Sequence, residues 1–307
     1  MCASGPPGEP LPPAARSPPR DGRQHPARRR GGAAPAAPPG GSGEDGAVDR
    51  TVLVLGGTAE ARRLASGLVG EPGVHVVTSL AGRVRQPLLP EGEVRVGGFG
   101  GPDALAAWLG EHGVVAVVDA THPFAARISA NAAAATAAAG VPLVVLRRPG
   151  WVPEPGWTVV GSLDAAAAAL PGLGERVFLT TGRGGLAAFA DSDLWFLVRS
   201  IDAPTPPAPR RMETVLARGP FTVADERDLL RAHAIDVLVT KDSGGPAAKL
   251  EAARAEGVPV LVVARPPVPA EVEVVETVAG ARSWVRDTVA RCAPSTSSAS
   301  ARAIPST

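Results

Sequence analysis

Short runs of apolar, mostly β-branched residues recur between residues 50 and 275, and each run stops at a polar or glycine-rich loop. The clearest run is Val114–Val118, which is followed by Asp119-Ala-Thr-His-Pro123 and then by an Ala-rich stretch. A run with no polar alternation is typical of a strand that is buried on both faces of a parallel sheet. Ligands bind outside the carboxyl ends of such strands, so the loop with Asp119, Thr121 and His122 is predicted to be functional.

The same pattern divides the ordered part of the chain into two predicted domains. Residues 50–148 alternate strand, helix, strand, strand, helix, strand, helix and strand, which predicts a parallel, Rossmann-like sheet covered by helices. Residues 149–157 contain prolines and glycines in place of a periodic pattern and are predicted to be a linker. A second alternating set over 158–292 predicts a second α/β domain, which ends with a strand near 271–275 and a helix to about 291.

Both ends of the chain differ from this pattern. Residues 1–49 are rich in Pro, Gly, Ala and Arg, and 293–307 are rich in Ser. Such segments bury too little apolar surface to offset the entropy cost of ordering, so both are predicted to be disordered. A basic arm for nucleic acid, or a start codon assigned too far upstream, are alternative explanations of the first segment.

Composition narrows the function classes. The chain has 307 residues, 45% of them hydrophobic, and a net charge of +1, which argues against nucleic acid and membrane surfaces as partners. No stretch of ~20 apolar residues and no apolar signal segment occurs, so a cytoplasmic protein is expected. The two cysteines, Cys2 and Cys292, lie near opposite ends and predict neither a disulfide nor a metal site.

Four loops of the first domain contain residues that suit a nucleotide. Gly56-Gly-Thr58 joins a strand to a helix start, where backbone N–H groups favour phosphate, although a tight turn alone would explain it. Ser79 and Arg83 follow the second strand, where a hydroxyl and a guanidinium suit the 2′-phosphate of NADP better than the acid expected for NAD; Arg83 as a plain surface residue is the alternative. The predicted cofactor-binding residues are Gly56, Gly57, Thr58, Ser79, Arg83, Gly97, Gly98 and Thr121.

In the second domain, strand after strand is followed by a cation. Arg183, Arg199, Lys241 and Arg265 occupy these positions, and Arg147 and Arg148 precede the linker. Cations along the carboxyl edge of a sheet suit a polyanionic ligand. The alternative is that these residues are ordinary charges on a solvated face. The predicted substrate-binding residues are Arg183, Arg199, Lys241, Ser243, Gly244 and Arg265.

Lysine itself is rare, because only Lys241 and Lys249 occur among 31 basic residues. In a chain that uses Arg wherever a positive charge suffices, a surviving lysine is a functional candidate. Chance survival on a solvated face is the alternative for Lys241 and the favoured explanation for Lys249. A nicotinamide nucleotide that delivers hydride to an acidic substrate also needs a proton donor. The candidate catalytic residues are His122, Lys241 and Asp119, although His122 could serve only the helix start and Lys241 only substrate charge.

Six motifs together resemble the precorrin-6A reductases of cobalamin biosynthesis, including the cobalt-precorrin-6A enzymes. They are Leu55-Gly-Gly-Thr-Ala-Glu60, Ser79-Leu-Ala-Gly-Arg83, Gly97-Gly-Phe-Gly-Gly101, Asp119-Ala-Thr-His-Pro-Phe-Ala125, Arg218-Gly-Pro-Phe-Thr222 and Lys241-Asp-Ser-Gly-Gly245. The resemblance implies two Rossmann-like domains with the active site in the cleft between them, and NADPH-dependent reduction of precorrin-6A, or its cobalt form, to precorrin-6B. It also implies transient contact with other cobalamin-pathway enzymes. Asp242 departs from the pattern, where Asn is expected.

Other functions are compatible with the same loops. An NADPH-dependent reductase or epimerase of another polyanionic metabolite would use them equally well. A non-catalytic nucleotide-binding module would leave the cations of the second domain without a role. A methyltransferase that uses S-adenosylmethionine would favour an acid after the second strand, where Ser79 and Arg83 occur.

Overall fold

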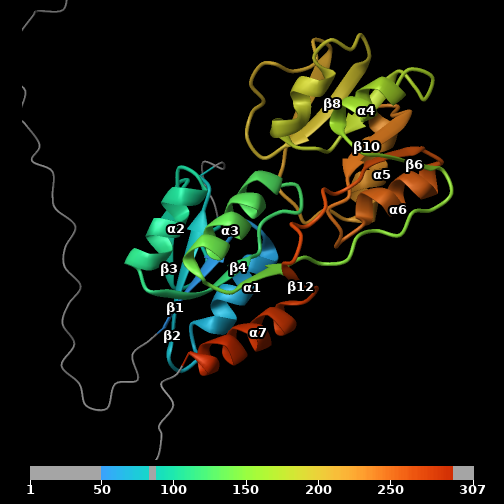
Figure 1. The fold of residues 1–307 in the computed structure, drawn as a ribbon. Coiled ribbons are helices and arrows are strands. Elements are labelled where there is room, and N and C mark those ends of the chain that lie inside the picture. Colours follow the sequence, from blue (N-terminus) through green and yellow to red (C-terminus); the bar gives the residue numbers. More distant parts are fainter. Residues whose placement is uncertain (1–49, 83–87, 293–307) are drawn as a thin grey trace, which may run out of the picture. The chain divides into compact units, whose positions relative to one another are not determined.

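The computed structural model describes residues 50–82 and 88–292, which form two six-stranded sheets with helices packed on them (Figure 1). All neighbouring strands in both sheets are parallel, which confirms the predicted α/β class. The strands are β1 (Arg50–Leu55), β2 (Val74–Leu80), β3 (Glu93–Val96), β4 (Val114–Asp119), β5 (Leu143–Leu146), β6 (Trp157–Val160), β7 (Arg176–Leu179), β8 (Trp195–Ser200), β9 (Met212–Leu216), β10 (Val237–Lys241), β11 (Val260–Val263) and β12 (Glu273–Val275). The helices are α1 (Ala59–Leu68), α2 (Pro102–Glu111), α3 (Ala126–Ala139), α4 (Leu163–Ala169), the 3-10 helix η1 (Arg183–Phe189), α5 (Val223–Ala232), α6 (Ala248–Glu256) and α7 (Val278–Arg291).

The two sheets share one strand order. The first runs β3-β2-β1-β4-β5-β12 and the second runs β9-β8-β7-β10-β11-β6. Each order reverses direction at its centre, between β1 and β4 in the first sheet and between β7 and β10 in the second. In open parallel sheets such a reversal leaves a crevice at the carboxyl ends of the two central strands, where ligands bind. The loops that follow β1 and β4 contain Gly56-Gly-Thr58 and Asp119-Ala-Thr121, so the first sheet brings these two predicted motifs together.

The end of the chain corrects one predicted domain boundary. We expected residues 271–291 to complete the second domain, but β12 pairs with β5 of the first sheet, and α7 packs on α1, β4 and β5. Figure 1 shows α7, in red, beside α1, in blue. The chain therefore passes from the first sheet to the second after β5 and returns after β11. Periodicity predicts that β12 and α7 exist, but it does not identify the sheet that they join.

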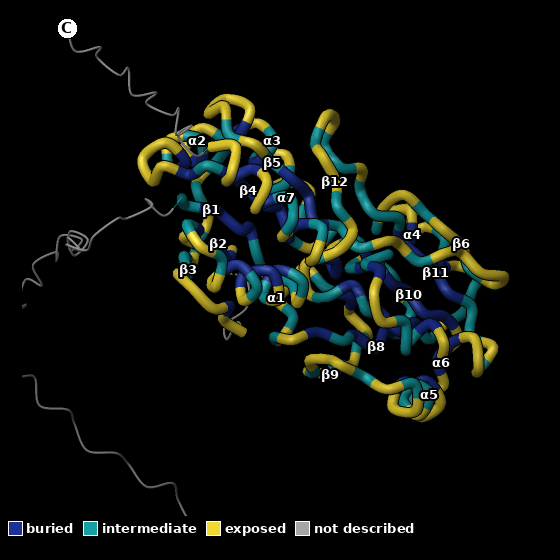
Figure 2. The backbone as a smooth tube through the Cα atoms, turned by 90° about the horizontal axis from the view of Figure 1, so that it is seen from below, coloured by how far each residue is buried: buried dark blue, intermediate teal, exposed yellow. Residues whose placement is uncertain are grey.

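Helices cover both faces of each sheet, because successive strand residues point to opposite faces. In the first sheet, one apolar cluster contains Val52 and Val54 with α1 and α7, and another contains Leu53 and Leu55 with α2 and α3. The second sheet packs one face on α4 and η1 and the other on α5 and α6. Figure 2 shows the buried residues concentrated along the central strands.

Two local differences from the sequence expectation occur in the second sheet. Strand β9 was not predicted, because it lies at the edge of the sheet and none of its residues is buried. The glycine-rich segment after β7 was expected to be a loop, but from Arg183 it forms η1, whose Leu186 and Phe189 enter the core. β9 forms through its backbone pairing with β8, and η1 forms where its apolar side chains pack into the core.

Some expectations fall on residues that the structure does not describe. The disorder predicted for 1–49 and 293–307 lies outside the described residues, as do Cys2 and Arg83. Within 50–82 and 88–292, no helix combines the length and apolar character required to cross a bilayer. Cys292 is an exposed free cysteine.

Replacing Val285 on α7 tests the packing of the returning helix. Val285 is fully buried in the cluster that contains α1, so Val285→Ala removes two methyl groups from a packed core and should lower the free energy of unfolding by about 2 kcal/mol. The matched control is Val274→Ala on β12, where the side chain is 42% exposed and the effect should stay within about 0.5 kcal/mol. Urea unfolding measures both, and equal losses would contradict the packing assigned to α7.

Candidate functional site

The loop between β1 and α1 is tied to both neighbouring strands. The Gly56 amide donates to the Ser79 carbonyl at 2.9 Å, and a Cβ at Gly56 would lie 2.8 Å from Thr78 Cγ2, so only glycine fits this close approach. Gly57 has φ +120°, and a Cβ added there would meet no atom within 4 Å, so its backbone faces open space. This geometry leaves the start of α1 accessible to an anion.

Thr58 connects that loop to the end of β4. Its Oγ1 accepts a hydrogen bond from the Ala61 amide at 3.0 Å, which caps α1, and donates to the Ala120 carbonyl at 2.8 Å. The hydroxyl is therefore occupied by the protein itself. Of the predicted nucleotide ligands in this loop, the backbone of Gly57 is therefore better placed to bind a phosphate than the Gly56 amide, which donates to Ser79, or the side chain of Thr58.

Arg95, a cation that was not among the predicted site residues, lies beside Ser79. Arg95 on β3 is the register partner of Ser79 on β2, and its guanidinium donates to the carbonyls of Gly97 and Gly98 at 2.7 and 3.0 Å. It also stacks 3.8 Å from the centroid of the Phe99 ring. Arg95 thus shapes the glycine loop in which Gly97 and Gly98 were predicted to approach a cofactor. Arg95 was not predicted as a site residue, because it lies within a strand and not in a loop.

Asp119 ends β4 with a buried carboxylate that is only half satisfied. Its Oδ1 accepts hydrogen bonds from the Thr121 amide at 3.0 Å and the Thr121 hydroxyl at 2.6 Å, and the residue is 2% exposed. Among the described residues, Oδ2 has no hydrogen-bond partner. A buried acceptor without a donor is costly, so this atom is suited to a hydroxyl or amide of a ligand.

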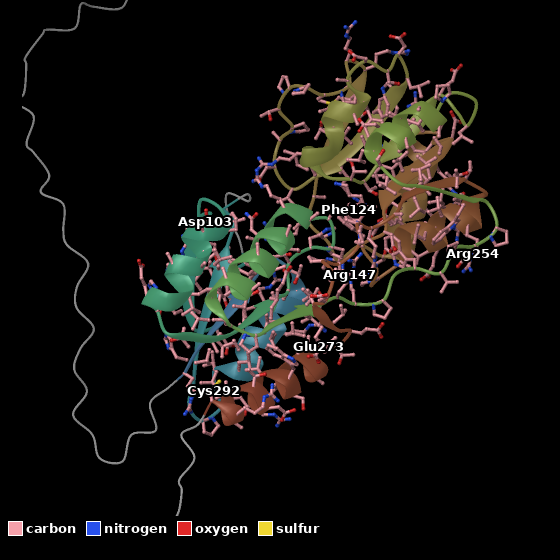
Figure 3. The ribbon with its side chains drawn as sticks, in the orientation of Figure 1. Asp103, Phe124, Arg147, Arg254, Glu273 and Cys292 are labelled. Atoms are coloured by element: carbon pink, nitrogen blue, oxygen red, sulfur yellow. The ribbon has the colours of Figure 1, made fainter. Side chains whose placement is uncertain are left out.

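A pocket of about 440 Å³ opens next to this carboxylate, at the ends of β4 and β5. Its lining includes Asp119, Thr121, His122, Arg147 and the returning segment Pro266–Ala270. Arg147, labelled in Figure 3, donates to the Pro266 carbonyl at 2.7 Å. The volume falls within the range of small-molecule sites. The structure therefore places the predicted residues Asp119, Thr121 and His122 in one pocket.

His122 lies in this pocket as a neutral imidazole. Its Nδ1 accepts from the Phe124 amide at 3.2 Å, which assigns the ring proton to Nε2. Desolvation, together with four nearby cations, lowers the pKa of His122 to about 4 although part of the residue is open to solvent. The four cations are Arg148, Lys241, Lys249 and Arg265. At neutral pH His122 can accept a proton, or donate a hydrogen bond from Nε2, but the free protein contains no imidazolium there.

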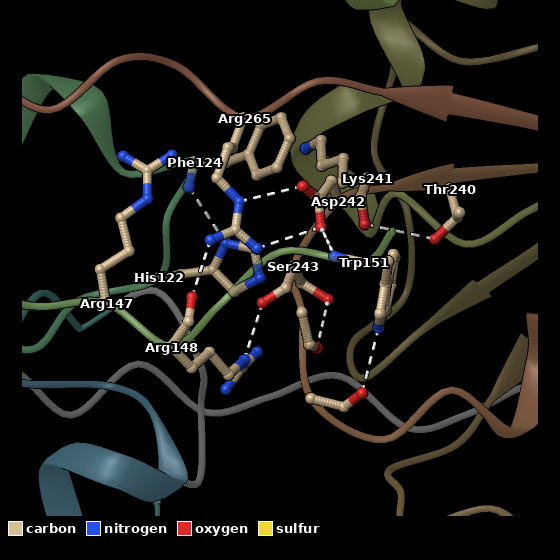
Figure 4. A network of polar contacts seen from close by, with 12 residues as sticks. His122, Phe124, Arg147, Arg148, Trp151, Thr240, Lys241, Asp242, Ser243 and Arg265 are labelled. Atoms are coloured by element: carbon tan, nitrogen blue, oxygen red, sulfur yellow. Dashed lines mark hydrogen bonds and ion pairs between the residues drawn. The ribbon is translucent and has the colours of Figure 1, made fainter. Parts of the chain in front are cut away.

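The linker that follows β5 is held against the loop Lys241–Gly245 by a partly buried ion pair (Figure 4). Asp242 accepts from Arg265 Nε at 3.1 Å and Arg265 Nη2 at 3.0 Å, and Asp242 Oδ1 also accepts from the Trp151 amide at 3.1 Å. Arg265 Nη1 donates to the Arg148 carbonyl at 2.8 Å. Asp242 therefore has its charge neutralised by Arg265, which explains how an acid is accommodated in a loop predicted to meet an acidic substrate.

Arg148 extends this network toward α1. Its Nη1 lies 2.8 Å from Glu60 Oε2 as an ion pair, and its Nε donates to the Ser243 carbonyl at 2.7 Å. A Cβ at Gly244, where φ is +65°, would lie 2.2 Å from the Pro149 carbonyl oxygen, so the loop and the linker pack directly on each other. Arg148 thus touches both the helix of the Gly56–Thr58 loop and the loop that contains Ser243 and Gly244.

The predicted substrate cations have different surroundings. Arg199 forms a two-bond ion pair with buried Glu226, at 2.9 and 2.8 Å, and stacks 3.9 Å from the Phe221 ring. Arg183 lies 3.8 Å from Asp202. Lys241 donates to the Thr181 carbonyl at 3.1 Å and lies 5.3 Å from the Phe124 ring, which places it near the His122 loop. The structure thus brings Lys241 to the candidate site, whereas the paired charges of Arg199 and Arg265 stabilise the fold.

Three residues of this region were missed as site candidates. Glu60 was quoted only within a motif, Arg148 only as a cation that precedes the linker, and Trp151 only as part of the linker. Arg148 and Trp151 make hydrogen bonds to residues of the segment 242–245, which are 91 to 95 positions away in the sequence. Glu60 pairs with Arg148 across a similar separation. No local sequence pattern could show such contacts. Lys249 did have a signal, namely its rarity, but it was assigned to a solvated face.

The sequence and the fold both match those of known proteins. The family model described as precorrin-6x reductase CbiJ/CobK matches residues 51–286. A precorrin-6A reductase of Rhodococcus erythropolis is 59% identical over 239 residues, which is 76% of this chain and 96% of the relative. A cobalt-precorrin-6A reductase of Priestia megaterium is 30% identical over 236 residues, covering 70% and 90%. A solved structure described as CobK precorrin-6A reductase aligns with a TM-score of 0.72 at 44% identity, over 78% of this chain and 97% of that one.

Asp242→Asn tests the ion pair that holds the linker. An amide keeps one acceptor but presents N–H to Arg265 and leaves that guanidinium without its counter-charge. Because both side chains are only 15–16% exposed, we expect the free energy of unfolding to fall by about 1–3 kcal/mol in urea titration. The control is Asp191→Asn, which changes an exposed acid in the turn before β8 and should leave the free energy of unfolding unchanged. Equal stability of Asp242→Asn and the unsubstituted protein would contradict this assignment.

Proposed function

The chain belongs to the precorrin-6x reductase family, and we propose that it uses NADPH to reduce precorrin-6A to precorrin-6B in cobalamin biosynthesis. The observation that supports this most directly is the family match over residues 51–286, because it includes both sheets, both crossing segments and every loop of the candidate site. A regulatory nucleotide-binding module would not require the half-satisfied Asp119 carboxylate, the pocket beside it and the cluster of cations around His122.

We assign the cofactor to the first sheet. The open backbone at Gly57 and the start of α1 would hold the phosphates, and the unpaired Asp119 Oδ2 would accept a hydrogen bond from the nicotinamide half. Thr121 would position the Asp119 carboxylate through its two hydrogen bonds. When bound, NADPH supplies the hydride. The preference for its 2′-phosphate rests on Ser79 and Arg83, with Arg95 as a neighbouring cation in register with Ser79.

The substrate is proposed to meet the cations near His122. Precorrins present several acetate and propionate carboxylates. Lys241 lies near the pocket, because its Nζ contacts the ring of Phe124, which in turn contacts the ring of the lining residue His122. Ser243 and Gly244 would contribute through the loop backbone that packs on the linker. Arg183 remains a proposed ligand at the edge of this region. Arg199 and Arg265 would act on substrate only indirectly, because each already forms two hydrogen bonds with a carboxylate.

Reduction of the macrocycle adds a proton as well as a hydride. His122 is neutral in the free protein, because desolvation and nearby cations lower its pKa to about 4. Lys241 donates to the Thr181 carbonyl, and its Nζ–H group is the type of donor that can give a proton to developing charge. We therefore assign proton donation to Lys241, and we assign to His122 a hydrogen bond from Nε2 that orients the substrate.

The metal-free substrate is preferred to the cobalt form in this proposal. The Rhodococcus relative, which is named for precorrin-6A, shares 59% of aligned residues, and the Priestia relative, which is named for cobalt-precorrin-6A, shares 30%. We further propose that the protein acts in the cytoplasm and that its contacts with other enzymes of the pathway are transient.

The test of this function is turnover of precorrin-6A by the purified chain with NADPH. We expect loss of NADPH absorbance and a product heavier by two hydrogens, measured by mass spectrometry, with slower turnover of cobalt-precorrin-6A under the same conditions. Absence of turnover with both substrates, while NADPH still binds, would contradict the proposal and favour another polyanionic metabolite.

Arg83→Ala tests the assignment of the 2′-phosphate. Losing one charge-assisted contact should weaken NADPH binding by about 2 kcal/mol and leave NADH binding unchanged, as measured by calorimetric titration of each nucleotide. Arg95→Ala is the matched comparison, because it removes the cation in register with Ser79. A selective loss in Arg95→Ala alone would move the 2′-phosphate to β3, and equal losses for NADPH and NADH would exclude a phosphate-specific role.

A further inference from the structure

Among the described residues, Lys249 differs from Arg148 and Arg265, two other cations around His122, by having no carboxylate partner. It lies in the first turn of α6, and among the described residues no carboxylate or hydrogen-bond acceptor pairs with its Nζ. By contrast, Arg148 pairs with Glu60 and Arg265 pairs with Asp242. The contact of Lys249 Nζ is with the face of the Trp151 ring, whose centroid is 4.8 Å away.

Trp151 holds this ammonium in a defined place. The Trp151 amide donates to Asp242 Oδ1 at 3.1 Å, and its indole Nε1 donates to the Gly245 carbonyl at 3.0 Å. Both the backbone of Trp151 and the edge of its ring are therefore held in place. A cation over a fixed aromatic face is positioned at little further entropy cost. Both residues are half-buried, so the site is partly withdrawn from water.

The surroundings of Lys249 favour an incoming anion. Desolvation by burial, followed by the positive charge of Arg199, lowers the pKa of Lys249 to about 8; Glu226 opposes this shift and Arg148 adds to it. A cation that has lost hydration without gaining a counter-ion binds a carboxylate more strongly than a solvated lysine does. Lys249 is also one of the four cations that lower the pKa of His122, which lines the pocket, so its charge acts on the candidate site.

We propose that Lys249 is a substrate-binding residue whose ammonium pairs with a peripheral carboxylate of the tetrapyrrole. This inference rests on the proposed function, which supplies a ligand with several carboxylates. Lys249 and Trp151 then form a preformed carboxylate site at the junction of α6 and the linker, separate from the residues that hold the nucleotide. The site determines substrate affinity and takes no part in hydride or proton transfer.

The kinetic test compares Lys249→Met with Lys249→Arg. Lys249→Met keeps the length and apolar stem of the side chain but removes its charge, and should raise KM for precorrin-6A roughly tenfold, the loss of one charge-assisted hydrogen bond. KM for NADPH and kcat should remain within about twofold, since the nucleotide site lies on other loops. Lys249→Arg keeps the charge and should recover most of the affinity.

Arg254→Met is the matched control. Arg254, labelled in Figure 3, lies on the same helix, is 67% exposed and has Glu154 as its partner at 3.5 Å. This variant should leave all three constants unchanged. An unchanged KM for precorrin-6A in Lys249→Met, or an equal rise in Arg254→Met, would overturn the assignment. If Lys249→Met fails to fold by circular dichroism, Lys249→Gln serves in its place with the same expectations.

The pH dependence of KM distinguishes a substrate-binding lysine from a purely structural one. Because the pKa of free Lys249 is about 8, the KM ratio of Lys249→Met to the unsubstituted protein should be largest below pH 8 and fall as pH rises through 8. A ratio independent of pH overturns the proposal.

If the unsubstituted protein fails to turn over precorrin-6A, the proposed function fails separately, and uroporphyrin binding measured by tryptophan fluorescence replaces KM as the readout. Equal affinity of the two proteins for uroporphyrin then overturns the carboxylate site.

Discussion

The ion pair between Asp242 and Arg265 is the constraint on which the candidate site depends. The chain crosses between the two sheets twice, after β5 and after β11, and both crossing segments meet at this pair. Arg265 begins the returning segment and donates to the carbonyl of Arg148 in the outgoing one, while Asp242 accepts from the Trp151 amide. Arg147 adds a hydrogen bond to the Pro266 carbonyl. One carboxylate therefore fixes the backbone from which Arg147, Arg148 and Trp151 project.

Arginine and lysine serve different purposes in this region, for a physical reason. A guanidinium pairs a carboxylate with two parallel hydrogen bonds and tolerates burial, which suits Arg199 with Glu226 and Arg265 with Asp242. An ammonium is a compact charge that loses more on desolvation and gains more from an added anion. In a chain that otherwise uses arginine, the two lysines, Lys241 and Lys249, both lie among the cations that act on His122. The scarcity of lysine therefore points to this cluster around His122 more directly than the position of arginines at strand ends does.

Much of the fold follows from the sequence because parallel strands buried on both faces form uninterrupted apolar runs. The loops after β1 and β4 could likewise be located, since the strand order places them at one crevice. Sheet membership could not be predicted, because an amphipathic helix such as α7 packs equally well on any complementary apolar face. Edge strand β9 could not be predicted either, because its side chains are not buried. Ion pairs such as Arg199 with Glu226 join residues 27 positions apart through tertiary packing and leave no trace in local pattern.

Glu60 and Arg148 show how two anionic ligands can be accommodated together. Burial raises the pKa of Glu60, but its backbone hydrogen bond and Arg148 outweigh burial and hold that pKa below its usual value, so Glu60 is ionised in the first turn of α1. An unpaired carboxylate there would repel the phosphate that the start of α1 otherwise attracts. Arg148 cancels that charge and, through Nε, also holds the Ser243 carbonyl of the loop proposed to face the substrate. A single guanidinium thus removes repulsion at the loop proposed to hold the nucleotide and fixes the loop proposed to face the substrate, which couples the geometry of the two proposed binding regions.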